Sequence, residues 1–209
     1  LRTPLNSIEG FINLLAKKQG LGREYSMYVQ TIKKSSAHLL ALVNDVLDFS
    51  KIEAGKLVLD EQQTDLYGLI YDVVDMLTPL ASEKNLNLAV LYYEDVPRQH
   101  VIDALRGKQV LTNLVSNAIK FTDSGHVLIS IEVLGRRDDK ARLRIAVEDT
   151  GVGINPEDVP LVYEPYVQLG QQFQRQLPGA GLGLTICRQL VGLMDGSMDL
   201  ESRPGEGST

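Results

Sequence analysis

The chain of 209 residues carries a net charge of −6, with 44% hydrophobic and 23% charged residues. These values are typical of a soluble globular protein with one large or two small domains, and without a basic block they argue against a nucleic-acid partner. The single cysteine, Cys187, excludes an internal disulfide and a cysteine-cluster metal site, and no apolar run approaches the ~20 residues that span a bilayer.

Residues 1–53 are expected to form two amphipathic helices joined by a turn at 20–22. In 1–18 the apolar residues recur with spacings of four and three, which is a heptad pattern. A second heptad pattern runs through 25–49, with Tyr25, Ile32, Leu39 and Val46 in one row and Tyr28, Ser35, Leu42 and Phe49 in the next. These apolar faces are wider than one helix can cover, which favours a homodimer with a four-helix bundle. A hairpin packed onto its own chain is the alternative.

A change of character at 54–61 predicts a linker, followed by a second domain over 62–209. The expected helices are 66–82, 103–122, a segment beginning near Pro156, and 181–194. The expected strands are 56–60, 87–93, 126–134, 141–148 and 197–202, with a hairpin at 135–140 and a loop at 95–99. Helices combined with mostly antiparallel strands imply an α+β fold, a two-layer α/β sandwich.

The most informative helical stretch is 109–122, QVLTNLVSNAIKFT. Its apolar residues recur with the period of a half-buried helix. Asn113, Asn117 and Lys120 are spaced four and three residues apart, so their side chains share one face. Two amides and an ammonium on one face suit phosphates and oxygen-liganded cations, although a merely solvated polar face has the same pattern.

Two glycine-rich stretches favour a phosphate-containing ligand. Asp149-Thr-Gly151-Val-Gly153 follows a predicted strand, so Asp149 can accept a hydrogen bond from an exocyclic amine such as that of adenine, while the glycines let a ligand approach closely; a simple turn is the alternative. Gly179-Ala-Gly181-Leu-Gly183-Leu184 precedes a helix whose N-terminal N–H groups attract phosphate. The intervening 163–178 is rich in Gln and is expected to form a lid.

In order and at matching spacing, these stretches resemble the sensor histidine kinases over essentially the whole chain. NLVSNAIKF resembles the family's N box, DTGVG its G1 box, YEPYVQ its F box, GAGLGL its G2 box and the terminal GEGST the start of its G3 box. LRTPLNSI resembles the residues that follow the phosphoacceptor in the H box, and KIEAGKL the junction between domains. The details are most similar to the kinase core of bacterial hybrid sensor kinases of the BarA/GacS type.

The resemblance implies ATP and Mg²⁺ as ligands and an ATPase domain of the Bergerat type. It implies that Asn117 binds Mg²⁺, that Asn113 and Lys120 contact phosphates, and that Asp149 reads adenine. It assigns the rest of the nucleotide pocket and lid to Gly151, Gly153, Tyr166, Gly179, Gly181, Leu182, Gly183 and Leu184. In the wider superfamily a glutamate that activates water typically stands at the position of Asn113, so an asparagine there favours transfer to a side chain over ATP hydrolysis.

The family pattern places the phosphoacceptor His two positions before Leu1, outside this chain. It places Thr3 where a residue assists dephosphorylation of a partner response regulator; an ordinary exposed helix residue is the alternative. The histidines that are present, His38, His100 and His126, have no H-box setting, and we interpret them as structural or surface residues. Cys187 is interpreted as a packing residue.

The sequence therefore predicts the core of a protein-histidine kinase of a two-component system. The parent protein is expected to transfer the γ-phosphoryl group of ATP to its own His and then to an Asp of a receiver domain, in cis or in trans. Pro178 and Ala180 depart from the family's lid pattern, so a catalytically quiet, nucleotide-gated dimeric scaffold is the alternative. Since the chain begins mid-pattern and ends in the G3 box, we expect a soluble fragment, the cytoplasmic portion of an inner-membrane bacterial sensor.

Overall fold

The computed structural model describes residues 22–138, 140–167 and 181–209, together with positions 8, 10, 12 and 15. Most of the first predicted helix and most of the predicted lid lie outside these residues. The helices within the described ranges are α2 (Arg23–Glu53), α3 (Leu66–Glu83), α4 (Ala104–Phe121), α5 (Gly183–Leu193) and the 3-10 helix η1 (Val159–Tyr163). The strands are β1 (Gln62–Asp65), β2 (Asn87–Tyr92), β3 (Gln99–Ile102), β4 (His126–Arg137), β5 (Lys140–Asp149), β6 (Ser202–Arg203) and β7 (Gly207–Ser208).

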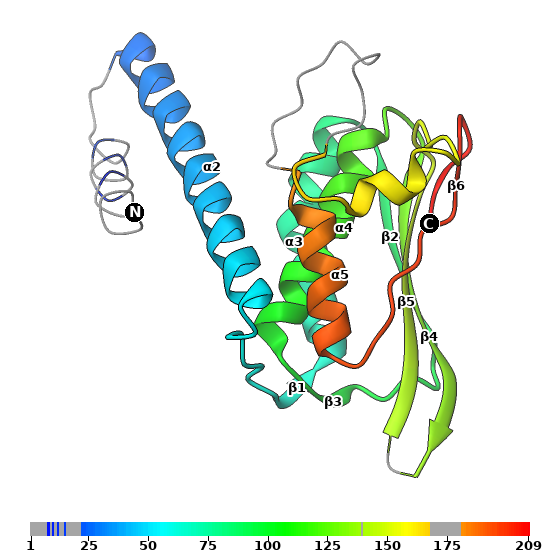
Figure 1. The fold of residues 1–209 in the computed structure, drawn as a ribbon. Helices are drawn as coiled ribbons and strands as arrows, with labels where there is room; N and C mark the ends of the chain where they lie inside the picture. The colour runs from blue at the N-terminus through cyan, green and yellow to red at the C-terminus, as the bar shows by residue number, and fades with distance from the viewer. Residues whose placement is uncertain are drawn as a thin grey trace.

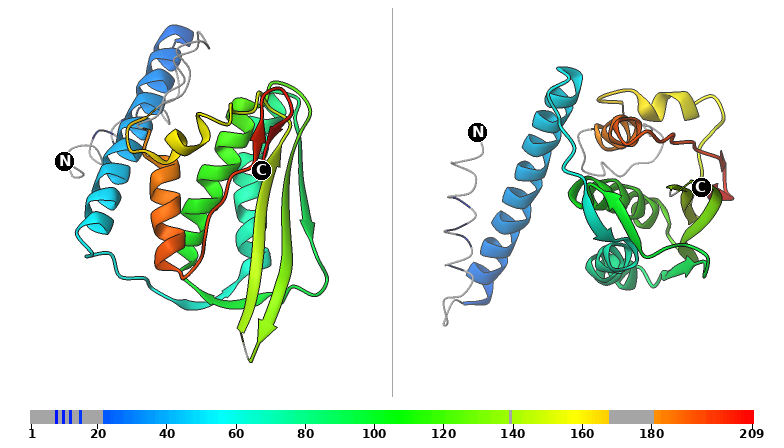
Figure 2. Two further views of the ribbon diagram at one scale, coloured as in Figure 1. Left: turned by 45° about the vertical axis from the view of Figure 1, so that its right-hand side comes forward. Right: turned by 90° about the horizontal axis from the view of Figure 1, so that it is seen from below.

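The main sheet has five strands in the order β2-β4-β5-β7-β6. β2 runs parallel to β4, and the remaining neighbours in this sheet are antiparallel. β1 and β3 form a separate antiparallel pair. Figures 1 and 2 show α3, α4 and α5 gathered on one side of the main sheet, with α2 standing beside them. The predicted α+β fold with two layers is confirmed.

The main core lies between the sheet and helices α3 and α4. β4 sends Val127, Ile129 and Ile131 into it, all fully buried, because alternate residues of a strand point to the same face. The helices contribute a matching set of apolar residues at helical spacing: Ile70, Val73 and Leu77 from α3, and Leu111, Val115 and Ile119 from α4. This packing fixes α4 against the sheet and leaves its opposite side for other contacts.

The C-terminal end of α2 packs against a second, smaller core. Phe49 and Ile52 contact the cluster that contains the fully buried Leu182, Ile186 and Leu190. The apolar rows nearer the N-terminus of α2 remain largely exposed: Tyr25, Tyr28, Ile32, Leu39 and Val46. Within the described part of the chain, other residues thus cover only the C-terminal end of the heptad face of α2. No helix within this part is long and apolar enough to cross a membrane.

Several predicted elements differ in the structure. Residues 56–60 are not a strand; the Asp60 N–H instead donates to Asp103 Oδ2 at 3.0 Å. The pair β1 and β3 was missed, so the predicted loop 95–99 ends in a strand that includes His100. His100 lies 2.7 Å, through its Nε2, from the Pro97 carbonyl oxygen, which agrees with a structural role.

The C-terminal part of the chain also departs from prediction. The segment after Pro156 forms only the five-residue η1. Its C-cap residue, Glu164, has an extended backbone, because the following Pro165 disfavours a helical conformation of the residue before it. The strand predicted at 197–202 shrinks to β6, because its partner β7 is only two residues long. Conversely, β4 and β5 extend further than predicted, which tightens their hairpin.

Candidate functional site

The helix α4 presents its polar face to a continuous surface hollow. Asp103 caps the helix, with its Oδ1 accepting the Arg106 N–H at 3.0 Å. From there the helix buries its apolar stripe in the core, so the residues of the opposite face point outward. Asn113, Asn117 and Lys120 all line the hollow.

The same hollow is lined by residues from two loops that are distant in sequence. Asp149 and Gly153 come from the end of β5 and the turn after it, Gly181 lies just before α5, and Gly183 and Leu184 are the first two residues of α5. The hollow is much larger than this group of residues, and it also includes parts of α2, β1, β3 and the hairpin between β4 and β5. Most of the predicted site residues therefore line one hollow, although they are spread over more than seventy positions of the sequence.

The loop after β5 is held by backbone contacts. Asp149 Oδ1 accepts the Gly151 N–H at 2.8 Å, and the Val152 N–H donates to the Phe121 carbonyl at the end of α4, 3.3 Å away. Burial raises the pKa of the Asp149 carboxyl, and hydrogen bonds from the Gly151 and Ser208 backbone partly oppose this rise. Gly153 has a φ of +65°, and a Cβ there would collide with the Arg203 carbonyl oxygen, so this position requires glycine.

The start of α5 lies directly against Asn113. A Cβ on Gly183 would be 3.2 Å from Asn113 Oδ1, so the glycine keeps this approach open. Just before it, the Tyr166 N–H donates to the Gly181 carbonyl at 2.9 Å, which joins the segment that precedes α5 to the segment that follows η1. Thr185 Oγ1 donates to the Tyr163 carbonyl at 2.8 Å and ties α5 to η1.

The remaining predicted site residues lie elsewhere or are not described. Gly151, Tyr166 and Leu182 do not line the hollow: Gly151 faces the end of α4, Tyr166 is 61% exposed, and Leu182 is fully buried in the second core. Gly179 and Thr3, like Ala180 and Pro178, lie outside the described residues.

Burial also affects the charged and thiol groups near α4. It lowers the pKa of the Lys120 ammonium, whose Nζ lies 5.0 Å from the centre of the Phe121 ring. Cys187 is fully buried in the second core, and burial raises the pKa of its thiol to about 12. Its interpretation as a packing residue is confirmed.

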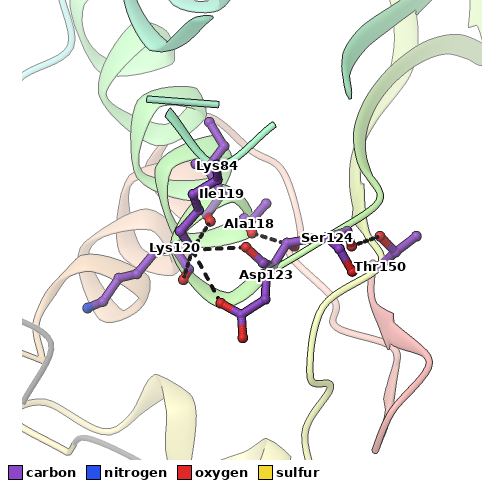
Figure 3. A network of polar contacts seen from close by, with 8 residues as sticks. Lys84, Ala118, Ile119, Lys120, Asp123, Ser124 and Thr150 are labelled. Atoms are coloured by element: carbon purple, nitrogen blue, oxygen red, sulfur yellow. Dashed lines mark hydrogen bonds and ion pairs between the residues drawn. The ribbon is translucent and has the colours of Figure 1, made fainter. Parts of the chain in front are cut away.

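Two polar clusters were missed by sequence reasoning. Arg106 Nη1 donates to Asp48 Oδ2 at 2.7 Å, and Gln109 Nε2 reaches the same oxygen at 3.1 Å, so α4 is joined to α2. At the other end of α4, Lys84 contacts several carbonyl oxygens (Figure 3). Neither cluster leaves a sequence signal, because Asp48 lies 58 positions from Arg106 and Lys84 lies at least 35 positions from its acceptors.

Comparisons with known proteins agree with this arrangement. Residues 102–209 match the family model described as histidine kinase-, DNA gyrase B-, and HSP90-like ATPase, and residues 1–55 match the His Kinase A (phospho-acceptor) domain. The fold and the two family matches thus define the class: an ATPase domain of this kind that follows a match to a phospho-acceptor domain.

The curated relatives identify the family. The sensor histidine kinase GacS of Pseudomonas protegens is 45% identical over 208 residues, and the signal transduction histidine-protein kinase BarA of Escherichia coli K12 is 39% identical over 209 residues. Each comparison covers all of this chain and 23% of the relative. The chain belongs to the sensor histidine kinases, which confirms the resemblance to that family and to the BarA/GacS type.

Solved structures with the same fold include complexes. Full-length ShkA in complex with AMPPNP has a TM-score of 0.79 and 35% identity, covering 99% of this chain and 42% of that one. The histidine kinase ThkA in complex with the response regulator TrrA has a TM-score of 0.64 and 26% identity, covering 99% and 56%.

Proposed function

We propose that this chain is the ATP-binding kinase core of a two-component sensor. The observation that carries the proposal is the meeting of Asn113, Asn117 and Lys120 with Asp149 and the glycines before α5 around one hollow. In the parent protein, the bond between the γ-phosphorus and the β,γ-bridging oxygen of ATP breaks. A bond from phosphorus to an imidazole nitrogen forms, ADP leaves, and the phosphoryl group then passes to an Asp of a receiver domain.

The phosphates would lie between α4 and the N-terminus of α5. The first N–H groups of α5 have no side-chain cap and carry the positive end of the helix dipole. Asn113 lies against this terminus, and Lys120 lines the same hollow. Because burial lowers the pKa of the Lys120 ammonium, a nearby phosphate would favour its charged form.

The residues fit a magnesium ion that is shared with the nucleotide. The described residues contain no group of three or more His, Cys, Asp or Glu side chains able to hold a metal. Mg²⁺ needs no such group, since in nucleotide sites it keeps waters and phosphate oxygens beside one or two protein oxygens. The Asn117 amide oxygen is suited to this role, and the ion would neutralise charge on the β- and γ-phosphates.

Asp149 is proposed to read the base. Its Oδ1 accepts the Gly151 N–H at 2.8 Å, which orients the carboxylate at the end of β5. Its second oxygen can accept a hydrogen bond from the exocyclic amine of adenine. A guanine would present a carbonyl oxygen instead, and two acceptors repel.

Asn113 favours phosphoryl transfer over hydrolysis. Its side-chain amide cannot take a proton from water, whereas a glutamate can act as a general base. Asn113 can still donate its N–H groups to a phosphate oxygen, so we propose that it positions the nucleotide.

The wider organisation follows the same proposal. Residues 1–53 would form the helical hairpin, 54–61 the linker and 62–209 the ATP-binding domain. Homodimerisation would cover the exposed apolar rows of α2, and Thr3 would assist dephosphorylation of the partner. A receiver domain is the expected partner, since the related ThkA was solved with a response regulator. The parent is proposed to be an inner-membrane bacterial sensor whose cytoplasmic part includes this chain.

The test is transfer of labelled γ-phosphate to the chain extended upstream to include the proposed acceptor His. We expect acid-labile, base-stable label, retained in Asn87→Ala, a matched asparagine exposed on β2, and lost in Asn117→Ala. Binding of Mg-ATP is measured in parallel by calorimetry. Binding without label would support the dimeric scaffold instead, steady phosphate release would support a hydrolase, and absence of both binding and label would refute the proposal.

A further inference from the structure

Lys84 closes the C-terminal end of α4. Its Nζ lies 2.8 Å from the Ile119 carbonyl oxygen, 2.7 Å from that of Lys120 and 2.9 Å from that of Thr122. An ammonium has three N–H donors, so these contacts use all of them. Figure 3 shows the Lys84 side chain reaching the end of the helix, while the Lys120 side chain points away from it.

The chemistry of a helix end explains why a lysine suits this place. The last carbonyls of an α-helix have no partner within the helix and carry its negative partial charge. Hydrogen bonds from a charged donor are roughly twice as strong as those between neutral groups. Asp123, 3.9 Å from Lys84 and 75% exposed, adds little beside these three bonds.

The base of Lys84 is itself fixed. Lys84 directly follows α3, and the chain then turns at Asn85, which has a φ of +55°. The Leu86 N–H returns to the Ala81 carbonyl at 2.9 Å and closes this turn. Since α3 is anchored in the main core through buried residues, Lys84 joins the end of α4 to a rigid element.

The end of α4 in turn places both sides of the nucleotide hollow. The Lys120 carbonyl accepts a hydrogen bond from Lys84, and the Lys120 side chain lines the hollow. Phe121 offers its carbonyl to the Val152 N–H at 3.3 Å, in the loop that carries Asp149 and Gly153. A shift of this helix end would therefore move the phosphate side and the base side of the site together.

We propose that Lys84 is a positioning residue for nucleotide binding, acting through the carbonyls at the end of α4. This inference rests on the proposed function, because it concerns the same nucleotide site. Lys84 does not touch the ligand: it sets where Lys120 and the loop after β5 stand.

The experiment compares three variants of the 209-residue chain. Lys84→Met keeps the length and removes the donors, and Lys84→Arg keeps a charged donor. Lys108→Met is the matched control, because Lys108 lies on α4 and its ammonium forms an ion pair with the exposed Asp72, at 3.2 Å. Mg-ATP affinity is measured by calorimetry at a temperature where each variant is folded, and amide hydrogen exchange is followed at Val152 and Thr122.

Lys84→Met is expected to weaken Mg-ATP binding at least about tenfold, the equivalent of one charge-assisted hydrogen bond. Lys84→Arg should restore most of the affinity, and Lys108→Met should bind as the unaltered chain does. Exchange at Val152 should accelerate in Lys84→Met alone. A merely stabilising lysine would lower the melting temperature without changing the affinity of the folded protein.

The outcomes separate this inference from the proposed function. If the unaltered chain binds no Mg-ATP, the proposed function fails, and exchange at Val152 still decides whether Lys84 positions the loop. If the unaltered chain binds Mg-ATP and Lys84→Met binds it equally well, Lys84 has no positioning role. Unchanged exchange at Val152 in Lys84→Met would overturn the inference in either case.

Discussion

Two side chains of opposite charge stabilise the two ends of α4. One is adjacent to the helix in the sequence, and the other lies far along the chain from the helix end that it contacts. At the N-terminal end, Asp103 accepts the Arg106 N–H through Oδ1 and the Asp60 N–H through Oδ2, each at 3.0 Å. At the C-terminal end, the Lys84 ammonium donates to three carbonyls at 2.7 to 2.9 Å. Each charge has the sign that the helix dipole favours at its end.

The two ends also face different neighbours. The first turns of α4 contact α2, through the ion pair between Arg106 and Asp48. The last turn contacts the loop after β5, through Phe121 and Val152. One helix therefore connects α2 with the loop after β5, and substitutions at its two ends should have separable effects.

The largest effect is expected at the C-terminal end, from Gly151→Ala. A Cβ on Gly151 would be 2.5 Å from the Phe121 carbonyl oxygen and 2.7 Å from Asp149 Oδ1. Relieving this overlap must shift the loop or the helix end, so we expect a loss of about 1–3 kcal/mol in the free energy of unfolding, measured with urea, and weaker nucleotide binding. The control is Gly135→Ala on β4, where an added Cβ meets nothing within 4 Å. If the two variants have the same free energy of unfolding and the same nucleotide affinity, the loop after β5 is not closely packed against the end of α4.

A smaller effect is expected at the N-terminal end, between Asp48 and Arg106. Their side chains are 16% and 17% exposed and are joined at 2.7 Å, so water screens the pair poorly. A double-mutant cycle with Asp48→Ala and Arg106→Ala should give a coupling energy of about 1–2 kcal/mol in urea unfolding. The control cycle uses Lys108 and Asp72, which are joined at 3.2 Å but are 39% and 69% exposed, and should give about 0.2–1 kcal/mol. If the two couplings are alike, the contact between α2 and α4 is not specifically stabilised by this pair.

A still smaller effect, and of opposite sign, is expected from Gly107→Ala in the second turn of α4. An added Cβ would lie 3.8 Å from Leu69 Cδ1 and 4.0 Å from Ile102 Cδ1, which is ordinary packing contact. Removing the backbone freedom of glycine should raise the free energy of unfolding by about 0.5–1 kcal/mol. Gly68→Ala in α3 is the comparison, since its Cβ would be 3.2 Å from Asp65 Oδ2 and should gain less. A destabilised Gly107→Ala would mean that this turn needs glycine for close packing.

The periodic elements of this fold could be predicted from sequence, and the short ones could not. The helix predicted at 66–82 is α3 (Leu66–Glu83) and that at 103–122 is α4 (Ala104–Phe121), because a long apolar period reports directly on a buried face. β1, β3 and β7 were missed, since strands of two to four residues exist only through their partners.

The same contrast holds for the site. Asn113, Asn117 and Lys120 were found because helical spacing places them on one face. Lys84 was missed because its three acceptors lie 35 to 38 positions away, and no local pattern marks a lysine that caps another helix. Asp149 was predicted from its motif. The burial of its carboxyl group, which governs its protonation, could not be predicted, because it depends on the pairing of β5 with β7.

That burial predicts the smallest change in stability, through pH. The native pKa of Asp149 is raised by burial, so between the ordinary aspartate pKa and the raised value the folded state binds more protons than the unfolded state. The free energy of unfolding must then fall as pH rises through this window, and the loss persists above it. Asp149→Asn removes this contribution while keeping an oxygen for the Gly151 N–H. Relative to the unaltered chain, it should therefore be more stable at neutral pH than in acid, in urea titrations from about pH 3 to about pH 7. The exposed Asp75→Asn on α3 serves as the control.

The same substitution should have the opposite effect on nucleotide affinity. Asp149→Asn should bind the nucleotide about tenfold or more weakly, through loss of one charge-assisted hydrogen bond. If Asp149→Asn has the same pH dependence as the unaltered chain, the partly buried carboxylate does not lower stability at neutral pH. If it binds ATP as tightly as the unaltered chain, the carboxylate does not recognise the ligand.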